Sequence, residues 1–482
     1  MSSPKLKSIA IVTPDIRGPV RNGGVGTAYA ALAEMLAAEG HRVTILFANR
    51  WTDEDTKFHH HQKRFWGKGI RLVSLPEPKV RLVGPDPARL SYAVYLYLKE
   101  NRFDIVHFPD LFGLGYFSLL AKKQGIAFSK TLLTVMLHGP SSWHKEGNRE
   151  SLSAPSARLV AVLERKSVEW ADVLVAPSRY ALSWAKKNKW KLPASKFVHP
   201  CPYFQKESKP KTSESGEFTK IVFFGRLETR KGIEVFCDAI RSLPKNVLAN
   251  RKVVFLGSYG TIQKMDAEVY LKRATRNWPR KPQVISNLGQ EEALKYLRSN
   301  QALVVIPSRS ETFGYTTFEC ISSSIPMIAS NIPAFRELIA KKHHKTVLFE
   351  LKVSALRKKI EEALKDGVSP ATLAIDHEVN RKFWIRFHRQ AVKKAPVKSR
   401  AVFKRTELKA FSSNGLKILL DGKHLLEAEL LISARKPSRK PRKKSIEHSG
   451  AYLSRAWKAD KAKRVSESLL TNPKRTDWFA RR

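Results

Sequence analysis

Short runs of β-branched and other apolar residues alternate with amphipathic stretches along the first half of the chain. The expected strands share this buried, β-branched character and lie at residues 9–12, 43–47, 104–107, 131–137 and 173–176. A Gly-rich turn leads from the first of them into an expected helix over residues 29–38. Because strand–helix–strand alternation is typical of parallel sheets, residues 1–204 are expected to form one doubly wound α/β domain.

The same alternation returns after a polar stretch at residues 205–217, QKESKPKTSESGE. This stretch has no periodic apolar face and is the expected linker. The strands expected after it lie at residues 221–224, 253–256, 284–285, 303–306 and 327–329, and the helices at residues 234–243 and 354–364. A second doubly wound domain is therefore expected over residues 218–388, so that two domains face a cleft.

The pattern fades from residue 389 onward. Residues 389–482 carry about 26 Lys and Arg against about 8 Asp and Glu, with RKPSRKPRKK at residues 435–444. We assign this basic C-terminal extension no fold.

Composition adds a strong positive charge to this picture. The chain has 482 residues, of which 42% are hydrophobic and 27% charged, which suits two globular cores, but its net charge is +45. Such an excess attracts polyanions, so an anionic membrane surface is an expected partner, with nucleic acid bound through the basic tail as the less favoured one. No apolar run reaches the roughly 18 to 20 residues that a spanning helix needs, so any membrane contact is expected to be peripheral.

The three cysteines have neither a pairing pattern nor metal-ligand spacing; they are Cys201, Cys237 and Cys320. Together with the lack of a signal-peptide core near the start, they predict a cytoplasmic protein, with the inner face of the membrane as its peripheral location. Asp53–Asp55 and His59–His61 look like metal ligands, but they lie in a polar stretch without ligand spacing and are expected to be solvated.

The most informative segment runs from Ser308 to Glu337, directly after the expected strand at residues 303–306. Ligands of open α/β sheets bind beyond the carboxyl ends of strands, so this loop and the helix expected from Tyr315 should face the cleft. Glu311 and Glu319 are eight positions apart, too far for a tight acid/base pair. Two separated carboxylates suit two separate diols, one on a hexose and one on a ribose.

Two further loops point to a phosphorylated ligand. GRLETRKG, residues 225–232, follows an expected strand. It places Arg226 and Lys231 where they could neutralise a diphosphate and stabilise the negative charge that develops as the diphosphate departs. Between the first expected strand and helix, the side-chain-free positions Gly23, Gly24 and Gly26 would let backbone approach a ligand, although a tight turn alone also explains them.

These motifs, with GHRVTIL at residues 40–46, His138-Gly139, Pro177-Ser178 and Leu256-Gly257, occur in an order that resembles the retaining GT-B glycosyltransferases of group 1, the GT4-like family. That family includes glycogen synthase-like and bacterial envelope-sugar transferases. The resemblance covers about residues 7–389 and implies two Rossmann-like domains, the first on the acceptor side and the second holding the donor. The end of the last helix, at residues 383–390, would cross back to the first domain.

The resemblance also implies roles for single residues. Arg226 and Lys231 would bind the donor diphosphate, Glu319 the ribose, and His138 would lie by the sugar at the reaction centre. Glu311 would hold the transferred sugar together with backbone groups of Phe313, Gly314 and Tyr315. No metal or cofactor is implied, the donor being a UDP- or GDP-linked sugar. The departing phosphate would help deprotonate a glycan, a lipid-linked or another acceptor, in the synthesis of a polysaccharide or a cell-envelope glycoconjugate.

Some features depart from the family or leave other functions open. Cys320 stands where Ala is common, and Ser324 where Gly is usual; both are small, so the packing is expected to survive. His138 could instead be a core histidine bonded to backbone. The alternatives at the level of function are a nucleic-acid- or polyanion-associated protein that uses the fold as a scaffold, and a nucleotide-sugar epimerase or phosphorylase.

Overall fold

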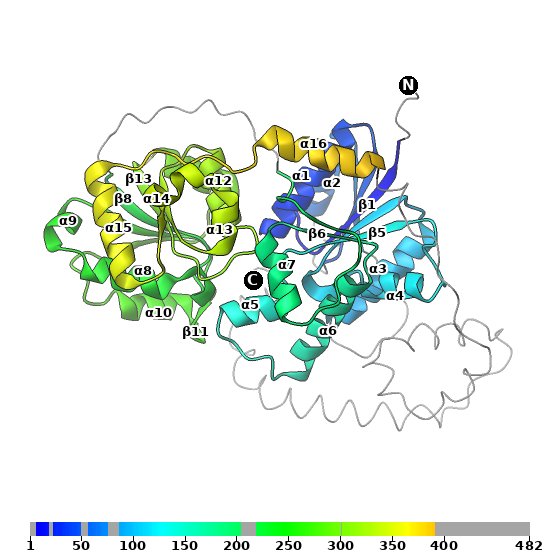
Figure 1. Cartoon of the computed structure of the whole chain (residues 1–482), viewed down its shortest axis with the longest axis horizontal. Helices are drawn as coiled ribbons and strands as arrows, with labels where there is room; N and C mark the ends of the chain where they lie inside the picture. Colours follow the sequence, from blue (N-terminus) through cyan, green and yellow to red (C-terminus); the bar gives the residue numbers. More distant parts are fainter. Residues whose placement is uncertain are drawn as a thin grey trace. The chain divides into compact units, whose positions relative to one another are not determined.

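The computed structural model describes residues 6–18, 23–49, 56–75, 86–203, 218–299 and 301–390. The expected linker at residues 205–217, the tail beyond residue 390 and Asp53–Asp55 lie outside these residues. Apart from residues 120–126, the described chain forms two α/β domains within one compact unit (Figure 1). None of its helices is long and apolar enough to cross a membrane.

The first domain is a parallel sheet of seven strands in the order β3-β2-β1-β4-β5-β6-β7. Its strands are β1 Ser8–Thr13, β2 Arg42–Phe47, β3 Ile70–Ser74, β4 Ile105–Pro109, β5 Leu132–Met136, β6 Val173–Ala176 and β7 Lys196–Val198. Its helices are α1 Gly24–Ala38, α2 Thr56–Trp66, α3 Asp86–Glu100, α4 Tyr116–Lys123, α5 Ser141–Gly147, α6 Pro155–Trp170 and α7 Arg179–Lys187, with a 3-10 turn, η1, at Leu111–Gly113. Five of the seven strands were predicted, and β3 and β7, at the two edges, were not.

The second domain has a parallel sheet in the order β12-β9-β8-β13-β14-β15 and a small antiparallel hairpin, β10-β11. Its strands are β8 Lys220–Phe224, β9 Lys252–Leu256, β10 Thr261–Ile262, β11 Met265–Asp266, β12 Gln283–Ile285, β13 Ala302–Ile306, β14 Met327–Ser330 and β15 Leu348–Phe349. Its helical elements are η2 Thr229–Lys231, α8 Ile233–Ser242, α9 Lys245–Ala249, α10 Ala267–Ala274, α11 Gln290–Ser299, α12 Tyr315–Ser322, α13 Pro333–Leu338, η3 Lys341–His343, α14 His344–Val347 and α15 Val353–Asp366.

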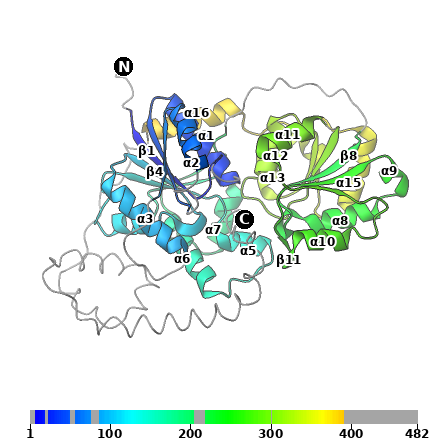
Figure 2. The same ribbon diagram turned by 180° about the vertical axis from the view of Figure 1, so that it is seen from behind.

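Side chains of the central strand β8 alternate between two cores, as a strand covered on both faces requires. Ile221 and Phe223 pack with residues of α8, α10 and α15, whereas Val222 and Phe224 pack with residues of α11, α12 and α13. Figure 2 shows these two groups of helices on opposite faces of the sheet. The doubly wound prediction for this domain is confirmed.

The last described helix, α16 His377–Gln390, returns to the first domain. Trp384 Nε1 donates a hydrogen bond to the carbonyl oxygen of Pro200 over 3.1 Å, and Asn380 Nδ2 donates to that of Cys201 over 2.9 Å. Trp384 is fully buried in the core that also contains Ile9 and Ile11 of β1. The helix therefore belongs to the first core although it follows the second domain in sequence.

Candidate functional site

The order of strands in the second sheet changes direction between β8 and β13, and ligands of such sheets bind at the carboxyl ends of the strands at this switch point. Residues 225–232 follow β8 and residues 307–314 follow β13, so the two sequence motifs meet there. Gly232 holds them close: its φ is +72°, and a Cβ atom at this position would lie 1.8 Å from the carbonyl oxygen of Pro307. Only glycine fits.

A buried cluster of ions joins the two loops. Lys231 Nζ lies 2.5 Å from Glu311 Oε1, and the Arg230 guanidinium bridges Glu311 Oε2 at 3.2 Å and Glu228 Oε1 at 2.6 Å. Ser308 Oγ donates a further hydrogen bond to Glu311 Oε1. We call Glu228, Arg230, Lys231 and Glu311 the ion cluster. Both carboxylate oxygens of Glu311 are thus already engaged by cations.

The electrostatics of the ion cluster follow from burial and from these pairings. Burial raises the pKa of Glu311, but the charges of Lys231 and Arg230 outweigh it and hold that pKa below its usual value. Burial lowers the pKa of Lys231 and of Arg226, which is within electrostatic range of Glu228 and Asp15. Three cations face two carboxylates in this part of the second domain, and the excess positive charge suits a diphosphate.

Glu319 has a different environment from Glu311. It lies one turn into α12, is 7% exposed, and accepts a hydrogen bond of 2.5 Å from Gln290 Nε2 at the start of α11. Burial raises the pKa of Glu319 to about 7, against the lowering effect of that hydrogen bond. The Oε1 atom of Gln290 accepts in turn from Arg17 over 3.2 Å.

His138 follows β5 in the first domain and is held by its backbone. Its N–H donates to Asp110 Oδ1 over 2.9 Å, and the N–H of Gly139 donates to Asp110 Oδ2 over 3.0 Å. The ring packs edge-on against Tyr29, and its Nε2 atom has no hydrogen-bond partner among the described residues. Burial lowers the pKa of His138 to about 3, so the imidazole is neutral at pH 7. It can donate or accept a hydrogen bond but carries no positive charge.

A second buried carboxylate fixes the residues after His138. Glu164 on α6 accepts hydrogen bonds from the backbone N–H and the hydroxyl of Ser141, at 2.8 and 2.6 Å, and from the N–H of Phe112. Burial raises the pKa of Glu164 to about 8 and that of Asp110 to about 7. Together the two carboxyl groups hold the turn between β5 and α5 from both sides.

The three glycines of the N-terminal motif occupy the start of α1 rather than a loop. The helix begins at Gly24, five residues before the expected start at Tyr29, and the N–H groups of Gly23 and Gly26 donate to Asp15 Oδ2 at 2.6 and 3.3 Å. This carboxylate replaces a local capping residue, so the residues next to the helix start carry no capping signal. Burial raises the pKa of Asp15 to about 6.

The loop before α12 contacts the first domain. Gly314 precedes the helix with a φ of +90°, Phe313 is buried, and the Tyr315 ring is 2.6 Å from where a Cβ atom of Gly24 would lie. Thr312 Oγ1 donates to the carbonyl oxygen of His138 over 2.7 Å. The residues predicted on the two domains are therefore brought together around this loop.

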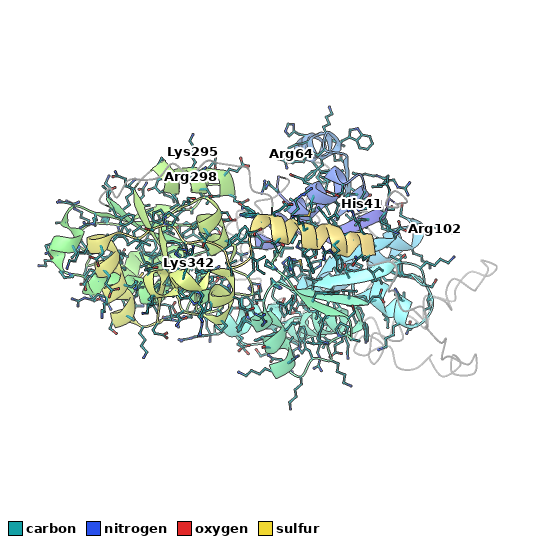
Figure 3. The ribbon with its side chains drawn as sticks, turned by 45° about the horizontal axis from the view of Figure 1, so that its top comes forward. His41, Arg64, Arg102, Lys295, Arg298 and Lys342 are labelled. Carbon is teal, nitrogen blue, oxygen red and sulfur yellow. The ribbon has the colours of Figure 1, made fainter. Side chains whose placement is uncertain are left out.

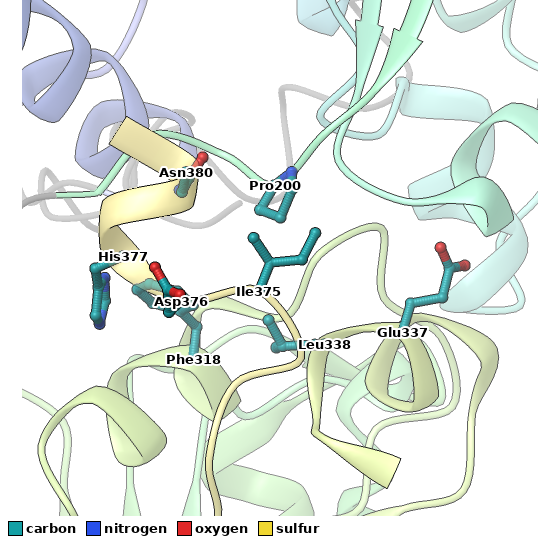
Figure 4. A pocket seen from close by; sticks show the side chains of 8 residues that line it. All are labelled: Pro200, Phe318, Glu337, Leu338, Ile375, Asp376, His377 and Asn380. Carbon is teal, nitrogen blue, oxygen red and sulfur yellow. The ribbon is translucent and has the colours of Figure 1, made fainter. Parts of the chain in front are cut away.

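A separate hollow is found where the chain crosses between the domains, lined by Pro200, Phe318, Glu337, Leu338, Ile375, Asp376, His377 and Asn380 (Figure 4). Apart from Phe318, which neighbours Glu319, its lining lies on the crossing segments, α13 and the start of α16. Glu337 here accepts hydrogen bonds from the N–H groups of Arg179 and Tyr180 at the start of α7. We assign this hollow a structural role.

Several site residues were missed by sequence reasoning: Asp15, Asp110, Glu164, Glu228, Arg230 and Gln290. Asp110 directly follows β4 and Asp15 follows β1, the two strands at the switch point of the first sheet, so acidic residues at those strand ends were a usable signal. Glu228 and Arg230 lie within the motif at residues 225–232, which follows β8, whereas Glu164 and Gln290 carry no such signal. His59, considered and rejected as a metal ligand, is exposed on α2 and hydrogen-bonded to Gln62.

Comparisons with known proteins agree with this architecture. The family model described as "Glycosyl transferases group 1" matches residues 204–376, and the "Glycosyl transferase 4-like domain" model matches residues 23–199. An uncharacterized glycosyltransferase of Methanocaldococcus jannaschii is 31% identical over 120 residues, which are 25% of this chain and 29% of that protein. The match thus spans less than a third of that relative's length.

Two solved structures illustrate the shared fold. Sucrose-phosphate synthase from Thermosynechococcus elongatus superposes with a TM-score of 0.54 at 18% identity, over 88% of this chain and 99% of that one. HepE from Anabaena, in complex with UDP-glucose, superposes with a TM-score of 0.51 at 15% identity, over 81% of this chain and 97% of that one. At such identities the likeness bears on the fold alone.

Proposed function

This chain belongs to the group 1, GT4-like glycosyltransferases of the GT-B fold, and we propose that it moves a hexose from a nucleotide-diphosphate sugar to a glycan or lipid-linked acceptor, with retention of anomeric configuration. The observation that carries this proposal is the group of three cations, Arg226, Arg230 and Lys231, at the carboxyl edge of β8. A UDP- or GDP-linked donor fits it, and HepE was crystallised with UDP-glucose.

The chemistry proposed for the site is stabilisation of a leaving group. The bond between the sugar C1 and the phosphate oxygen breaks, and its electron pair stays on the departing diphosphate. Arg226 and Lys231 neutralise that charge, which lowers the barrier most where water is excluded. The acceptor oxygen bonds C1 on the same face, and its proton passes to the departing phosphate. No metal or cofactor takes part in this scheme.

Other residues would bind and orient the substrates. Glu319 would accept hydrogen bonds from the ribose hydroxyls, and neutral His138 would offer one hydrogen bond beside the sugar. Since Lys231 and Arg230 already engage Glu311, we assign it first to holding Lys231 in place, and contact with the transferred sugar would add to that role. Backbone groups of residues 313–315 would line the sugar.

A donor screen tests the proposal. Purified protein is incubated with UDP- and GDP-sugars, and nucleotide release and thermal shift are measured for the wild type, Arg226→Ala and Glu311→Ala. Lys358→Ala, an 81% exposed side chain on α15, is the matched control. We expect both site variants, and not the control, to lose release and shift. A wild-type shift that neither variant weakens would place the donor elsewhere.

Two further measurements test the finer points. The anomeric configuration of the product by NMR should match that of the donor, and an inverted product would exclude retention. Activity should be unchanged by excess EDTA, and its loss would contradict a metal-independent reaction. Release of product without any added acceptor would favour an epimerase or phosphorylase.

A further inference from the structure

A concentration of lysines lies between α7 and β7 in the first domain. It comprises Lys186, Lys187, Lys189, Lys191 and Lys196, and all five are exposed. No Asp or Glu occurs between residues 173 and 206. Positive side chains project from other surfaces too, such as Arg64 and Arg102 on the first domain and Lys295, Arg298 and Lys342 on the second (Figure 3).

The five lysines are not neutralised by neighbouring acids. None of them forms a salt bridge with another described residue. Glu169 on α6 comes near, but Arg165 and Lys166 occupy its two oxygens at 2.7 and 2.8 Å, and its contact with Lys191 is to the backbone N–H. Lys196 reaches only carbonyl oxygens of its own loop. The positive charge is therefore presented to solvent.

Apolar side chains stand beside this charge. β7 is an edge strand, and all three of its residues are exposed, with Phe197 at 41% and Val198 at 40%. The Phe197 ring is fixed from behind by Phe383 and Phe387 of α16, with centroid distances of 6.1 and 5.9 Å. Phe197 and Val198 point to opposite faces of the sheet, and Val198 shares its face with Lys196, so we call the five lysines with Val198 the β7 edge surface.

Ordinary structural roles account for part of this surface. Lys186 and Lys187 lie in the last turn of α7, where cations complement the helix dipole. Lys196 on an edge strand discourages pairing with other chains. Neither role explains Lys189 and Lys191, or why Val198, on the same face of β7 as Lys196, is left 40% exposed.

We propose that the β7 edge surface docks on an anionic lipid bilayer. A lysine close to such a surface strengthens binding about fivefold, so five lysines and a small apolar contact give reversible attachment without a spanning segment. The exposed Val198 favours a bilayer over nucleic acid, because a lipid interface accepts an aliphatic side chain, whereas this side chain can neither pair with phosphate nor stack on bases as an aromatic ring does.

The position of the surface links it to the proposed function, on which its biological meaning rests. α7 begins at the site: Ser178 Oγ, just before it, donates to the carbonyl oxygen of Thr312 over 2.6 Å. Seven residues of the helix, a rise of about 10 Å, precede the first of the lysines, Lys186. Docking would hold the loop before α12 within a short distance of the lipid headgroups, where a lipid-linked acceptor would present its sugar.

Vesicle sedimentation tests the docking without any donor. The full chain is mixed with vesicles of phosphatidylcholine containing 30% phosphatidylserine, and with pure phosphatidylcholine, at low and high salt. The test variant is Lys187→Glu/Lys189→Glu/Lys191→Glu, and the matched control is Arg273→Glu/Arg276→Glu/Lys281→Glu on an exposed part of the second domain, with the same change in net charge. Val198→Ser tests the apolar contact.

We expect the test variant to lose about a hundredfold or more in partitioning to anionic vesicles, the control to lose about threefold or less, and Val198→Ser to lose a few-fold. Equal losses in the two triple variants would show that only net charge matters, and no loss in the test variant would place binding elsewhere; either result overturns the proposal. So would a larger loss of affinity for a 30-nucleotide single-stranded DNA than for vesicles. The thermal shift with UDP or GDP, measured on the same variants, reports separately on the donor site.

Discussion

Replacing Gln290 with leucine should change how the donor site responds to pH. Gln290 Nε2 donates to Glu319 Oε1, and Glu319 is the carboxylate proposed to accept from the ribose hydroxyls. Burial already raises the pKa of Glu319 to about 7, and the Gln290 hydrogen bond opposes that rise. Leucine keeps the approximate volume and removes the donor, so the ionised form of Glu319 loses stabilisation.

The size of the effect follows from the hydrogen bond. A bond to a charged acceptor contributes about 1.5–3 kcal/mol, and 1.36 kcal/mol corresponds to one pH unit, so the midpoint for ionisation of Glu319 should move upward by about one to two pH units. At pH 7 roughly half of the wild-type carboxyl groups are ionised, against about a tenth or fewer in the variant. The affinity for UDP or GDP should therefore fall about fivefold to fiftyfold at pH 7 and recover near pH 9.

Calorimetric titration with UDP and with GDP between pH 6 and pH 9 measures this change. Gln283→Leu, an exposed glutamine on β12, is the control and should leave the profile unchanged. A loss of affinity that is equal at every pH would mean that Gln290 shapes the pocket without acting on the ionisation of Glu319. Identical profiles for the wild type and Gln290→Leu would refute the role of the hydrogen bond altogether.

Three predictions concern stability. Arg230→Met leaves two buried carboxylates without their shared cation, so the free energy of unfolding in urea should fall by about 3–5 kcal/mol, whereas Arg357→Met, in an exposed pair, should change it by less than 1 kcal/mol. Gly232→Ala should prevent folding or lower the melting temperature by many degrees, because its Cβ atom would lie 1.8 Å from a carbonyl oxygen. Gly367→Ala is the control: its φ is also positive but the space around it is open, so it should cost only about 1–2 kcal/mol of the free energy of unfolding. Equal costs for the two variants would contradict the steric argument. Burial raises the pKa of Glu164 from 4.5 to about 8, so between these pH values the folded state keeps a proton that the unfolded state releases. Through this group, the free energy of unfolding should fall by about 1.4 kcal/mol for each pH unit of increase between pH 4.5 and pH 8. Denaturation at several pH values should show that this decrease is absent in Glu164→Gln.

The fold was predictable where strands are buried on both faces. β8 and β13 read as continuous apolar runs, and the predicted ranges differ from the observed ones by a single residue at the start. β7 was missed because Lys-Phe-Val on an exposed edge has no apolar pattern, and β15 because it has only two residues. The early start of α1 depends on Asp15, which lies eight residues before Gly23, and local sequence does not reveal that contact.

One departure from the family pattern has a conformational meaning that sequence alone did not give. Ser324, where glycine is usual, adopts a φ of +52°, in the left-handed region that glycine enters without strain. Cys320, the other departure, is fully buried in the core that contains Val222 and Phe224 of β8. Both residues are small, as the sequence analysis noted. At position 324, however, glycine suits the site because the backbone φ is positive there.

The two glutamates show why the site was only partly predictable. Their spacing indicated that they do not form a pair, but their electrostatic environments depend on partners that the sequence does not single out. Arg230 is one of 88 lysines and arginines, and only the fold places it between Glu228 and Glu311. The cations around Glu311 hold its pKa below the usual value. Glu319 accepts a hydrogen bond from the Gln290 amide, with Lys231 and Arg17 at longer electrostatic range, and burial raises its pKa to about 7. Of the two glutamates, Glu319 is therefore the one whose ionisation near neutrality should affect donor binding, and Glu311 should act as a fixed anion that orients Lys231.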